Sequence, residues 1–402
     1  MPENDSPQPL RLGIIGLGRA FSLMEPCLAH DPRIHIAAGT DPRKEAREFF
    51  ERHYDAKTYA SAEELCKNPD LDAVYISSPH QYHRHHVELA MRNGKHALVE
   101  KPMALSLHDC EAMIEAAHKA QRVMIIGHSH SFDLPIKRSA ELIASQQYGA
   151  VKMIHALQYT DFLYRPRRPE ELDTSRGGGV IFNQAPHQID IIRLLGGGRV
   201  ASVRAMIGRW DETRPTEGAY SALLTFENGA FASLTYSGYA HFDSDEWNEW
   251  IGESGQSKNP DHYGAARSKL SAIGHQSEEI ALKNDYNYGG QKYSAPLSTQ
   301  TENSPWHQHF GSLIISCTKA DLRPMPHKIM IYNDKQRQSL DLPRPIVQRS
   351  EVIDELYNAI RHNKPALHDG EWALATMEVC FALLQSAQSQ SEIRMTKQKA
   401  CY

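Results

Sequence analysis

The chain has 402 residues, of which 41% are hydrophobic and 23% charged, and its formal net charge is -5. A chain of this length and composition forms two or three globular domains, and its acidic balance disfavours nucleic acid or an anionic membrane as a partner. No apolar run reaches the length of a membrane span, and the six cysteines are scattered without metal-ligand spacing, which indicates reduced core thiols and no metal site. The polar, proline-rich residues 1–10 lack the apolar core of a signal peptide, so we expect a disordered lead-in to a cytoplasmic protein.

A short apolar strand over residues 11–15 leads into a turn that contains Gly16 and Gly18. A helix to about residue 30 and a second strand over 34–39 complete a strand–helix–strand unit, whose helix amides can receive a pyrophosphate. The third glycine position of this fingerprint holds Phe21, which predicts a looser contact between helix and strand. We expect the cofactor-binding residues of this turn to be Gly16, Gly18, Arg19, Ala20 and Phe21.

Asp41 stands at the end of the second strand, where a carboxylate can bind the ribose hydroxyls of NAD. Its charge would repel the 2′-phosphate of NADP, although Arg43 could soften that repulsion. Asp41 could also cap the helix that begins after Pro42, a role compatible with ribose binding. We therefore expect Asp41 and Arg43 to contact the cofactor, and favour NAD over NADP.

Three further apolar segments, 73–77, 96–99 and 123–127, alternate with segments of helical periodicity at 82–93 and 106–120. Strands that alternate with helices in this way predict a doubly wound parallel sheet, the Rossmann arrangement.

The strand over 73–77 is broken by Ser78 and Pro79, and His83 follows at the start of the next helix. We expect these residues to lie at the carboxyl end of a parallel strand, where open α/β sheets bind ligands, and to contact the cofactor or its loops. A metal cluster of His83 with His85 and His86 is a less favoured alternative.

Glu100-Lys101-Pro102 closes the strand over 96–99, at the same edge of the sheet. Pro102 fixes its own φ and biases Lys101 toward an extended conformation, so the lysine stands on a rigid turn. A lysine beside a nicotinamide ring indicates hydride transfer. We expect Glu100 and Lys101 to contact the cofactor and Lys101 to act in catalysis.

After residue 130 the pattern changes to half-exposed strands, with a strong hairpin turn at Asn228-Gly229. An antiparallel sheet after a parallel domain predicts an α+β domain for substrate binding and oligomerisation. The expected domains are therefore 11–130 and 131–402, with residues 241–300 as a polar surface insertion, lid or subunit contact. The expected strands cover 151–159, 200–210, 220–226, 230–236, 312–317 and 328–332, and helices cover 134–145, 350–363 and 370–388.

The run Gly177-Gly178-Gly179 lets the backbone approach a ligand or a partner closely. Downstream, Asn183, His187 and Asp190 are spaced by four and three, so a helix would place them on one face. His187 can serve as a general acid or base, since its unperturbed pKa lies near working pH. A purely structural histidine is the alternative, which the glycine run and the dinucleotide domain make less favoured.

Over residues 12–388 these features resemble the glucose–fructose oxidoreductase / inositol dehydrogenase / MocA family. The resemblance rests on the glycine turn, the Pro79 and His83 motif, Glu100-Lys101-Pro102, and the glycine run followed by His187. It implies that Lys101 and His187 act at the reacting carbon. The family's aspartate position is Asn183 here, and a neutral amide can orient a hydroxyl group but cannot relay a proton.

Three segments, 128–132, 161–168 and 216–220, resemble the subgroup of phthalate 4,5-cis-dihydrodiol and chlorobenzoate dihydrodiol dehydrogenases. Arginines gather before the glycine run, and the planar fork of arginine suits bidentate carboxylate binding. The alternative is a solvated basic loop that pairs with Glu170, Glu171 and Asp173. The substrate-binding residues expected on this basis are His128, His130, Arg165, Arg167, Arg168, Arg176 and Asp190.

The sequence thus predicts an NAD-dependent dehydrogenase that oxidises a ring alcohol, in the first place a cis-dihydrodiol of a carboxylated arene. A sugar or cyclitol dehydrogenase of the same fold is the alternative. A non-catalytic NAD-binding homologue is a third possibility, indicated by Phe21 and Asn183 and opposed by the presence of both Lys101 and His187. We expect a small-molecule substrate and a homo-oligomer, a dimer or tetramer formed through the C-terminal sheet.

Overall fold

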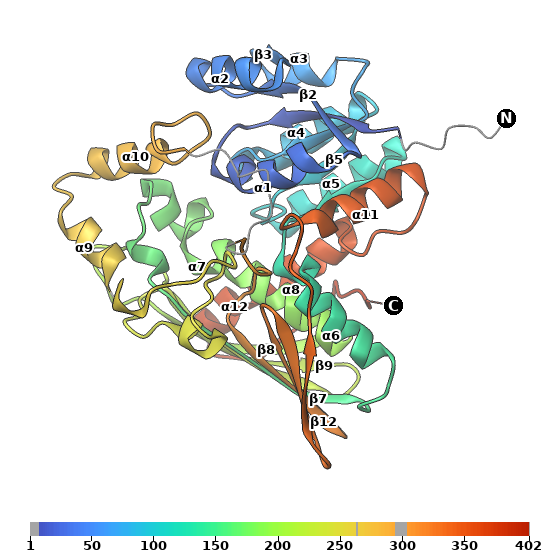
Figure 1. Ribbon diagram of the computed structural model, residues 1–402, viewed down its shortest axis with the longest axis vertical. Helices are drawn as coiled ribbons and strands as arrows, with labels where there is room; N and C mark the ends of the chain where they lie inside the picture. Colours follow the sequence, from blue (N-terminus) through green and yellow to red (C-terminus); the bar gives the residue numbers. More distant parts are fainter. Residues whose placement is uncertain (1–7, 263, 294–303, 402) are drawn as a thin grey trace. The chain divides into compact units, whose positions relative to one another are not determined.

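The computed structural model describes residues 8–262, 264–293 and 304–401, and the chain divides into two compact units (Figure 1). The first unit comprises residues 1–128, 284–299 and 349–373, and the second comprises the remainder. The expected second domain ran from residue 131 to the C-terminus, whereas two of its segments, 284–299 and 349–373, belong to the first unit. Most of the expected lead-in, residues 1–7, lies outside the described residues, and Leu10 already begins the first strand.

The first unit is built on a six-stranded parallel sheet of order β3-β2-β1-β4-β5-β6. Its central strands are almost entirely apolar and buried, as strands covered by helices on both faces must be. The predicted doubly wound fold is confirmed. The strands are β1 (Leu10–Ile15), β2 (Ile34–Thr40), β3 (Lys57–Tyr59), β4 (Ala73–Ile76), β5 (His96–Val99) and β6 (Met124–Ile126), and the helices are α1 (Arg19–His30), α2 (Lys44–Tyr54), α3 (Ala62–Cys66), α4 (His83–Arg92), α5 (Leu107–Ala120) and α11 (Ser350–Arg361).

An aromatic cluster over α1 and α2 explains why Phe21 replaces a small residue in the glycine turn. The Phe21 ring is fully buried and packs against Phe50 of α2 and against Tyr288, with ring centroids 6.1 Å and 4.9 Å apart. The buried Glu25 of α1 accepts a hydrogen bond from the Tyr293 hydroxyl group. Residues 284–293, expected in a surface insertion, belong to this unit, and Tyr288 from this segment packs on the Phe21 ring.

The second unit is built on a nine-stranded sheet of order β14-β13-β12-β11-β7-β10-β9-β8-β15. Only the β7–β10 pair is parallel among its described pairs, so the predicted α+β architecture is confirmed. The strands are β7 (Val151–Tyr159), β8 (Val200–Gly208), β9 (Ala219–Phe226), β10 (Phe231–Ser237), β11 (Ser312–Cys317), β12 (Ala320–Met325), β13 (Lys328–Asn333), β14 (Arg337–Asp341) and β15 (Ile393–Arg394).

One face of this sheet is covered by helices, with α8 packed on β7 and β10 and α6 on β12 and β13 (Figure 1). Its helices are α6 (Leu134–Ala144), α7 (Gly179–Asn183), α8 (Ala185–Gly196), α9 (Ala265–Ser271), α10 (Gln276–Asp285), and α12 (Gly370–Ser389), whose first turn is assigned to the first unit. Among the described residues, no helix combines the length and apolarity needed to cross a membrane.

The helix expected to carry Asn183, His187 and Asp190 on one face is interrupted. Gln184 leaves the helical conformation, with φ -121° and ψ -43°, and separates α7 from α8. Asn183 therefore ends α7, whereas His187 and Asp190 lie on α8. The single helical face expected for all three residues is corrected accordingly.

Candidate functional site

The glycine turn of the first unit has the backbone geometry of a dinucleotide-binding loop. Gly16 has φ +99°, and a Cβ there would lie 2.9 Å from the backbone of Ser77 and Ser78, so only glycine fits. A Cβ at Gly18 would meet nothing within 4 Å, and no side chain caps the start of α1. Space is therefore open at the start of α1, where helix amides can receive a pyrophosphate.

Asp41 is buried and joins the end of β2 to the glycine turn. Its Oδ2 accepts a hydrogen bond of 2.8 Å from the Leu17 amide, and its Oδ1 accepts the Arg43 amide at 2.9 Å. The Arg43 guanidinium also pairs with Asp41, at 3.0 Å. This pairing leaves the Asp41 carboxylate beside the loop in which a nucleotide ribose would be bound, with Arg43 directed at Asp41.

His83 connects the turn after β4 to the Glu100-Lys101-Pro102 turn. The ring is fully buried, with Nε2 2.9 Å from the Ser78 carbonyl oxygen and Nδ1 3.1 Å from that of Pro102. His83 was expected to contact either the cofactor or its loops. The structure shows contacts with the two loops. His85 and His86 point elsewhere, to Glu63 and to the Ser78 hydroxyl.

Glu100 is buried at the end of β5 and accepts a hydrogen bond of 2.5 Å from the Tyr75 hydroxyl group. Burial raises the pKa of Glu100, and the Tyr75 hydrogen bond and the positive charges of Arg349 and Lys101 oppose this shift. Glu100 thus anchors the turn that carries Lys101.

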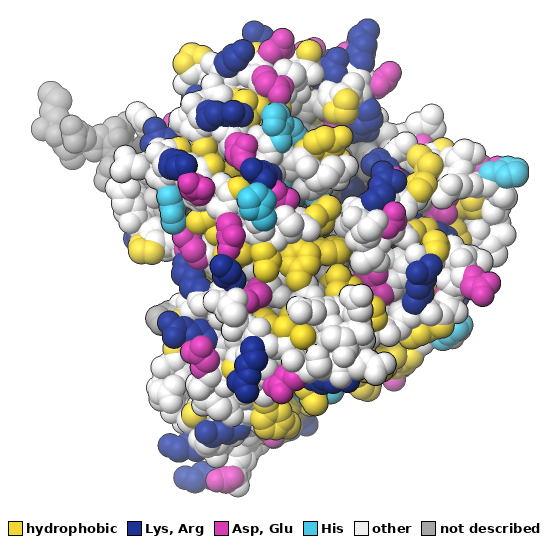
Figure 2. Space-filling view, turned by 180° about the vertical axis from the view of Figure 1, so that it is seen from behind, with side chains coloured by type: hydrophobic (Ala, Val, Ile, Leu, Met, Phe, Trp, Pro, Cys, Tyr) yellow, Lys and Arg dark blue, Asp and Glu magenta, His cyan; other side chains and the backbone are white. Residues whose placement is uncertain are grey.

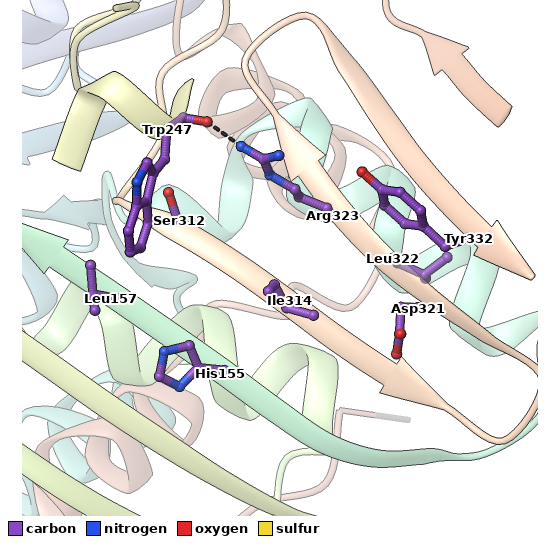
Figure 3. A pocket seen from close by; sticks show the side chains of 9 residues that line it. All are labelled: His155, Leu157, Trp247, Ser312, Ile314, Asp321, Leu322, Arg323 and Tyr332. Atoms are coloured by element: carbon purple, nitrogen blue, oxygen red, sulfur yellow. Dashed lines mark hydrogen bonds between the residues drawn. The ribbon is translucent and has the colours of Figure 1, made fainter. Parts of the chain in front are cut away.

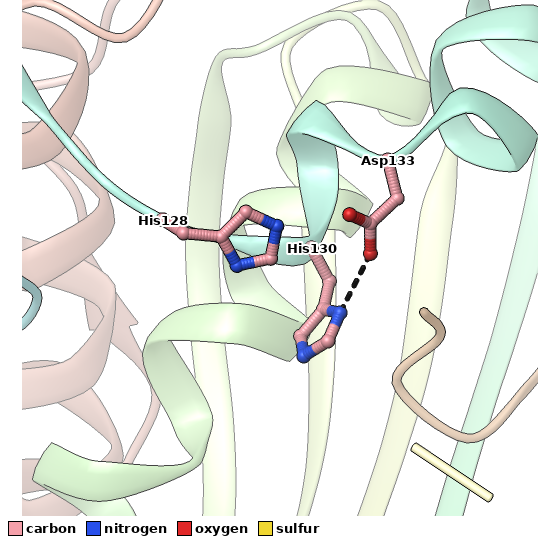
Figure 4. Close-up of side chains that lie close together, drawn as sticks. All are labelled: His128, His130 and Asp133. Carbon is pink, nitrogen blue, oxygen red and sulfur yellow. Dashed lines mark hydrogen bonds and ion pairs between the residues drawn. The ribbon is translucent and has the colours of Figure 1, made fainter. Parts of the chain in front are cut away.

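In the second unit, His187 of α8 lies in a buried cluster of rings. Its ring centroid is 4.8 Å from that of His130 and 5.1 Å from that of Phe310. His130 Nδ1 lies 2.7 Å from Asp133 Oδ2, the contact drawn in Figure 4, and His130 Nε2 lies 3.7 Å from Glu253. Among the predicted substrate residues, His130 therefore contacts His187, whereas His128 is the last residue of the first unit.

The pKa of His130 is raised above its usual 6.5, because the charges of Asp133 and Glu253 outweigh the lowering effect of burial. The His130 contribution to folding is therefore fully present below about pH 6.5 and is lost as pH rises through the higher folded-state pKa. We expect His130→Asn to lower the thermal midpoint more at pH 6 than at pH 9. Thermal unfolding checks this, with the exposed His275→Asn as control; an equal loss at both pH values would contradict it.

Two of the four predicted arginines act on a buried tyrosine beside His187. Burial raises the pKa of Tyr236 and the charges of Arg165 and Arg167 oppose this shift. The Tyr236 hydroxyl group contacts Gln184 at 3.2 Å, and its ring stacks on Phe310, which contacts His187. The Thr160 and Leu163 amides donate to Ser237 and Gly238 just after Tyr236, so the segment that carries Arg165 and Arg167 joins this end of β10.

Arg165 and Arg167 differ in how they are held. The Arg167 side chain is 11% exposed, and its guanidinium lies 3.6 Å from the Phe162 ring centroid and donates to the Phe162 carbonyl oxygen at 2.7 Å. Burial lowers its pKa to about 10, against the opposing charge of Glu171. Arg165 is 45% exposed and pairs with Asp161 at 3.0 Å. Its Nε and Nη2 donate to Asp161 and Thr160, and the charge of Glu253 also acts on it.

The other two predicted arginines have different surroundings. Arg176 is exposed and its charge acts on Asp173. The Arg168 amide donates to Glu171 at 2.8 Å at the start of the short helix η4 (Pro169–Leu172). Part of this segment therefore fits the alternative expectation of a basic loop that pairs with its own acidic residues.

The glycine run approaches the protein itself. A Cβ at Gly178 would lie 2.6 Å from the Glu171 backbone, and one at Gly179, which has φ +76°, would lie 2.0 Å from the Glu217 carboxylate. Asn183 Nδ2 donates back to the Gly179 carbonyl oxygen at 2.8 Å. The glycine run and Asn183 therefore set the backbone conformation before α8. Close packing against the protein itself accounts for the glycines without a ligand.

Asp190 is buried one turn after His187. Its carboxylate accepts hydrogen bonds from the Ser131 hydroxyl group and from Thr376 Oγ1, the latter at 3.0 Å. These contacts connect α8 to its neighbours through Asp190, which the sequence predicted to bind substrate.

Sequence reasoning missed four residues of this region: Tyr236, Glu253, Phe310 and Arg214. Each lies on a strand or loop distant in sequence from His187. The alternation of β10 indicates that Tyr236 faces inward, but no local signal shows what it meets.

Comparison with known proteins agrees with this geometry. Residues 10–128 match the Gfo/Idh/MocA oxidoreductase family model with the NAD-binding Rossmann fold, and residues 136–258 match the C-terminal domain of the same family. The chain is 47% identical over 383 residues to 1-carboxy-3-chloro-3,4-dihydroxycyclohexa-1,5-diene dehydrogenase of Comamonas testosteroni, covering 95% of this chain and 96% of the relative.

Two further relatives bear on the family. A crystal structure from Bordetella bronchiseptica RB50, of a protein assigned as a dehydrogenase, is 41% identical with a TM-score of 0.90, covering 96% of this chain and 100% of that one. Myo-inositol 2-dehydrogenase of Thermotoga maritima is 28% identical over 61% of this chain and 74% of its own length. The predicted resemblance is confirmed, and the chain belongs to the Gfo/Idh/MocA family of NAD-binding oxidoreductases.

Proposed function

We propose that this protein oxidises a cis-dihydrodiol of a carboxylated arene to the corresponding catechol. The observation that carries the proposal is that the segment leading to Arg165 and Arg167 is hydrogen-bonded to the end of β10, from the Thr160 amide to Ser237 and from the Leu163 amide to Gly238. This end of β10 carries Tyr236, which stacks on Phe310 beside His187. A neutral sugar or cyclitol has no group that needs two guanidinium ions, whereas a substrate carboxylate does. The Comamonas relative, whose name specifies a carboxyl group and two hydroxyl groups on a cyclohexadiene ring, supports the same substrate class.

In this reaction the diol loses two electrons and two protons and becomes a catechol. NAD, when bound, accepts the hydride from the ring carbon. We assign the hydroxyl proton to His187, which has the chemistry of a general base. Lys101 would donate a hydrogen bond to the reacting oxygen and stabilise its developing negative charge. The ketone that forms tautomerises to the aromatic catechol, which makes the oxidation favourable.

Turnover of 3,4-dihydroxycyclohexa-1,5-diene-1-carboxylate, followed by NADH absorbance and by chromatography of the product, tests this proposal. We expect one 3,4-dihydroxybenzoate for each NADH formed. Myo-inositol serves as the comparison substrate for the alternative cyclitol activity, which the weaker likeness to the Thermotoga enzyme favours less. NADH formed from inositol alone would overturn the arene assignment.

We propose NAD rather than NADP as the cofactor, since the buried Asp41 carboxylate would repel a 2′-phosphate. Asp41→Ala should narrow the difference in Kd between the two nucleotides. Because Arg43 pairs with Asp41, this change also frees a guanidinium group that favours the 2′-phosphate. Fluorescence titration of both nucleotides measures the effect, and tighter NADP binding by the unmodified protein would refute the assignment.

We propose that the open face of the nine-stranded sheet joins two copies of the chain, in a dimer or a tetramer. Cross-strand neighbours Met153 of β7 and Phe231 of β10 are 39% and 47% exposed on this face, and Leu223 of β9 is 58% exposed. Beside them, Figure 3 shows a hollow lined in part by Ile314 and Trp247. Apolar side chains gathered on an open sheet favour burial against a partner.

Leu223→Asp should shift the protein toward the monomer in sedimentation velocity, because a charge would be buried at the contact. The exposed Ile346→Asp, outside the sheet, is the matched control. An unchanged sedimentation coefficient for Leu223→Asp would exclude this face.

We place the enzyme in the cytoplasm, since all six of its cysteines are free thiols. Figure 2 shows Lys and Arg interspersed with Asp and Glu over the face it presents. This mixture, together with the net charge of -5, favours a small molecule over a polyanion as the ligand.

A further inference from the structure

Helix α10 contributes two charged side chains to the second unit, in a region that the sequence indicated to be a surface insertion. Glu279 is buried, and Lys283 follows four residues later with a side chain that is 18% exposed. Both contact the segment 161–172, here called the arginine loop, which carries Arg165 and Arg167.

One carboxylate oxygen of Glu279 joins two segments. Glu279 Oε1 accepts the backbone amide of Arg167 at 2.6 Å and Arg214 Nη1 at 2.9 Å. Arg214 lies between β8 and β9, and its side chain is only 5% exposed. Charge-assisted hydrogen bonds of this length are among the strongest in proteins, so Glu279 ties the arginine loop to the connection between β8 and β9.

Lys283 holds the arginine loop at a second point. Its ammonium group pairs with Glu171, whose carboxylate also lies 3.7 Å from Arg167 Nη1 and accepts the Arg168 amide. Burial lowers the pKa of Lys283 to about 8, against the opposing charge of Glu171.

The guanidinium groups of Arg165 and Arg167 depend on the arginine loop for their positions. Arg167 donates to the carbonyl oxygen of Phe162 and lies over its ring, so its guanidinium follows the loop backbone. Arg165 precedes it by two residues, and its side chain donates to Asp161 and to Thr160 at the end of β7. Movement of the Arg167 amide would therefore displace the Arg167 guanidinium and the backbone that carries Arg165.

We propose that α10 is a specificity element, in which Glu279 and Lys283 position Arg165 and Arg167 for the carboxylate of the substrate. Glu279 and Lys283 are positioning residues that act through the arginine loop. This inference rests on the proposed function, since it takes a carboxylated dihydrodiol as the substrate.

The test compares two substrates that differ only in the carboxylate: 3,4-dihydroxycyclohexa-1,5-diene-1-carboxylate and the cis-dihydrodiol of benzene. Glu279→Gln should raise KM for the carboxylated diol about tenfold or more, the scale of one hydrogen bond to a charged group, and leave kcat/KM for the neutral diol within about threefold. Lys283→Gln should likewise impair the reaction of the carboxylated diol more than that of the neutral diol. Glu278→Gln changes an exposed neighbour whose carboxylate accepts a hydrogen bond from the Gly274 amide. It is the matched control and should change the kinetics of neither substrate.

A purely structural role for Glu279 would lower kcat/KM for both diols alike, and that outcome overturns the proposal. In a chain that already carries Arg165→Ala and Arg167→Ala, Glu279→Gln should cause no further loss with the carboxylated diol, since it acts through these arginines. An additional loss there would also overturn it.

Hydrogen exchange provides a readout that needs no substrate. Glu279→Gln should speed exchange across residues 161–172, where the Arg167 amide loses its charged acceptor, and unchanged exchange would contradict the positioning role. The two proposals fail in different ways. If the unmodified enzyme does not prefer the carboxylated diol, the proposed function fails; if it does and Glu279→Gln retains the preference, the inference about α10 fails.

Discussion

Replacing His187 with alanine is expected to lower kcat about 100-fold or more, the usual scale for loss of a positioned acid–base group. The ring lies in a buried cluster with His130 and Phe310, so its removal takes away the proton acceptor that we assign to the reaction. Lys101→Ala should have an effect of similar size, because the developing charge on the reacting oxygen loses its hydrogen-bond donor.

Both variants should bind NAD with nearly unchanged affinity, since the glycine turn and Asp41 remain intact. Stopped-flow measurement of NADH formation, with nucleotide Kd determined in parallel, separates the chemical step from cofactor binding. Near-normal turnover by His187→Ala would remove this histidine from the mechanism. If a variant lost affinity for NAD by the same factor as it lost kcat, the replaced residue would act only through cofactor binding.

Replacing Arg165 with alanine is expected to reduce kcat/KM for a carboxylated dihydrodiol by about 10- to 150-fold, from the 1.5–3 kcal/mol of a hydrogen bond to a charged group. Arg165 is the stronger candidate of the two arginines, because its side chain is 45% exposed, whereas that of Arg167 is 11% exposed and contacts Phe162 and Glu171. Lysine at position 165 should restore only part of the loss, since it lacks the planar fork.

The exposed Arg176→Ala is the control for Arg165→Ala and should behave as the unmodified enzyme. Steady-state kinetics with the carboxylated and the neutral diol measure both variants. Normal turnover of the carboxylated diol by Arg165→Ala would contradict a role of Arg165 in carboxylate recognition. An equal loss of kcat/KM for both diols would contradict it as well.

The regular parts of both units were predictable because their signals are local. The apolar strands, the turn at Gly16 and Gly18, and the lysine turn after β5 each follow from a few neighbouring residues. Short or amphipathic elements such as β3 and β15 carry too few residues for a periodic signal and were not anticipated.

The parts that failed depend on partners far away in the chain. Phe21 looked like a defect in the fingerprint because its partner, Tyr288, comes from a polar segment more than two hundred residues later. The glycine run looked like a ligand site because the Glu217 side chain that occupies that space gives no signal in the sequence. The arginine cluster was visible in sequence, but the difference between Arg165 and Arg167 depends on Phe162, Glu171 and Tyr236 in three dimensions.

The most direct test of the proposed activity is the rate of NADH formation by the unmodified enzyme with three substrates: 3,4-dihydroxycyclohexa-1,5-diene-1-carboxylate, the cis-dihydrodiol of benzene and myo-inositol. The proposed contact between the arginine loop and the substrate carboxylate amounts to at least one hydrogen bond. On this proposal kcat/KM for the carboxylated diol should exceed that for the neutral diol by about tenfold or more, with inositol lower still. Equal rates with the two diols, faster oxidation of inositol, or no NADH from any of the three would contradict the account.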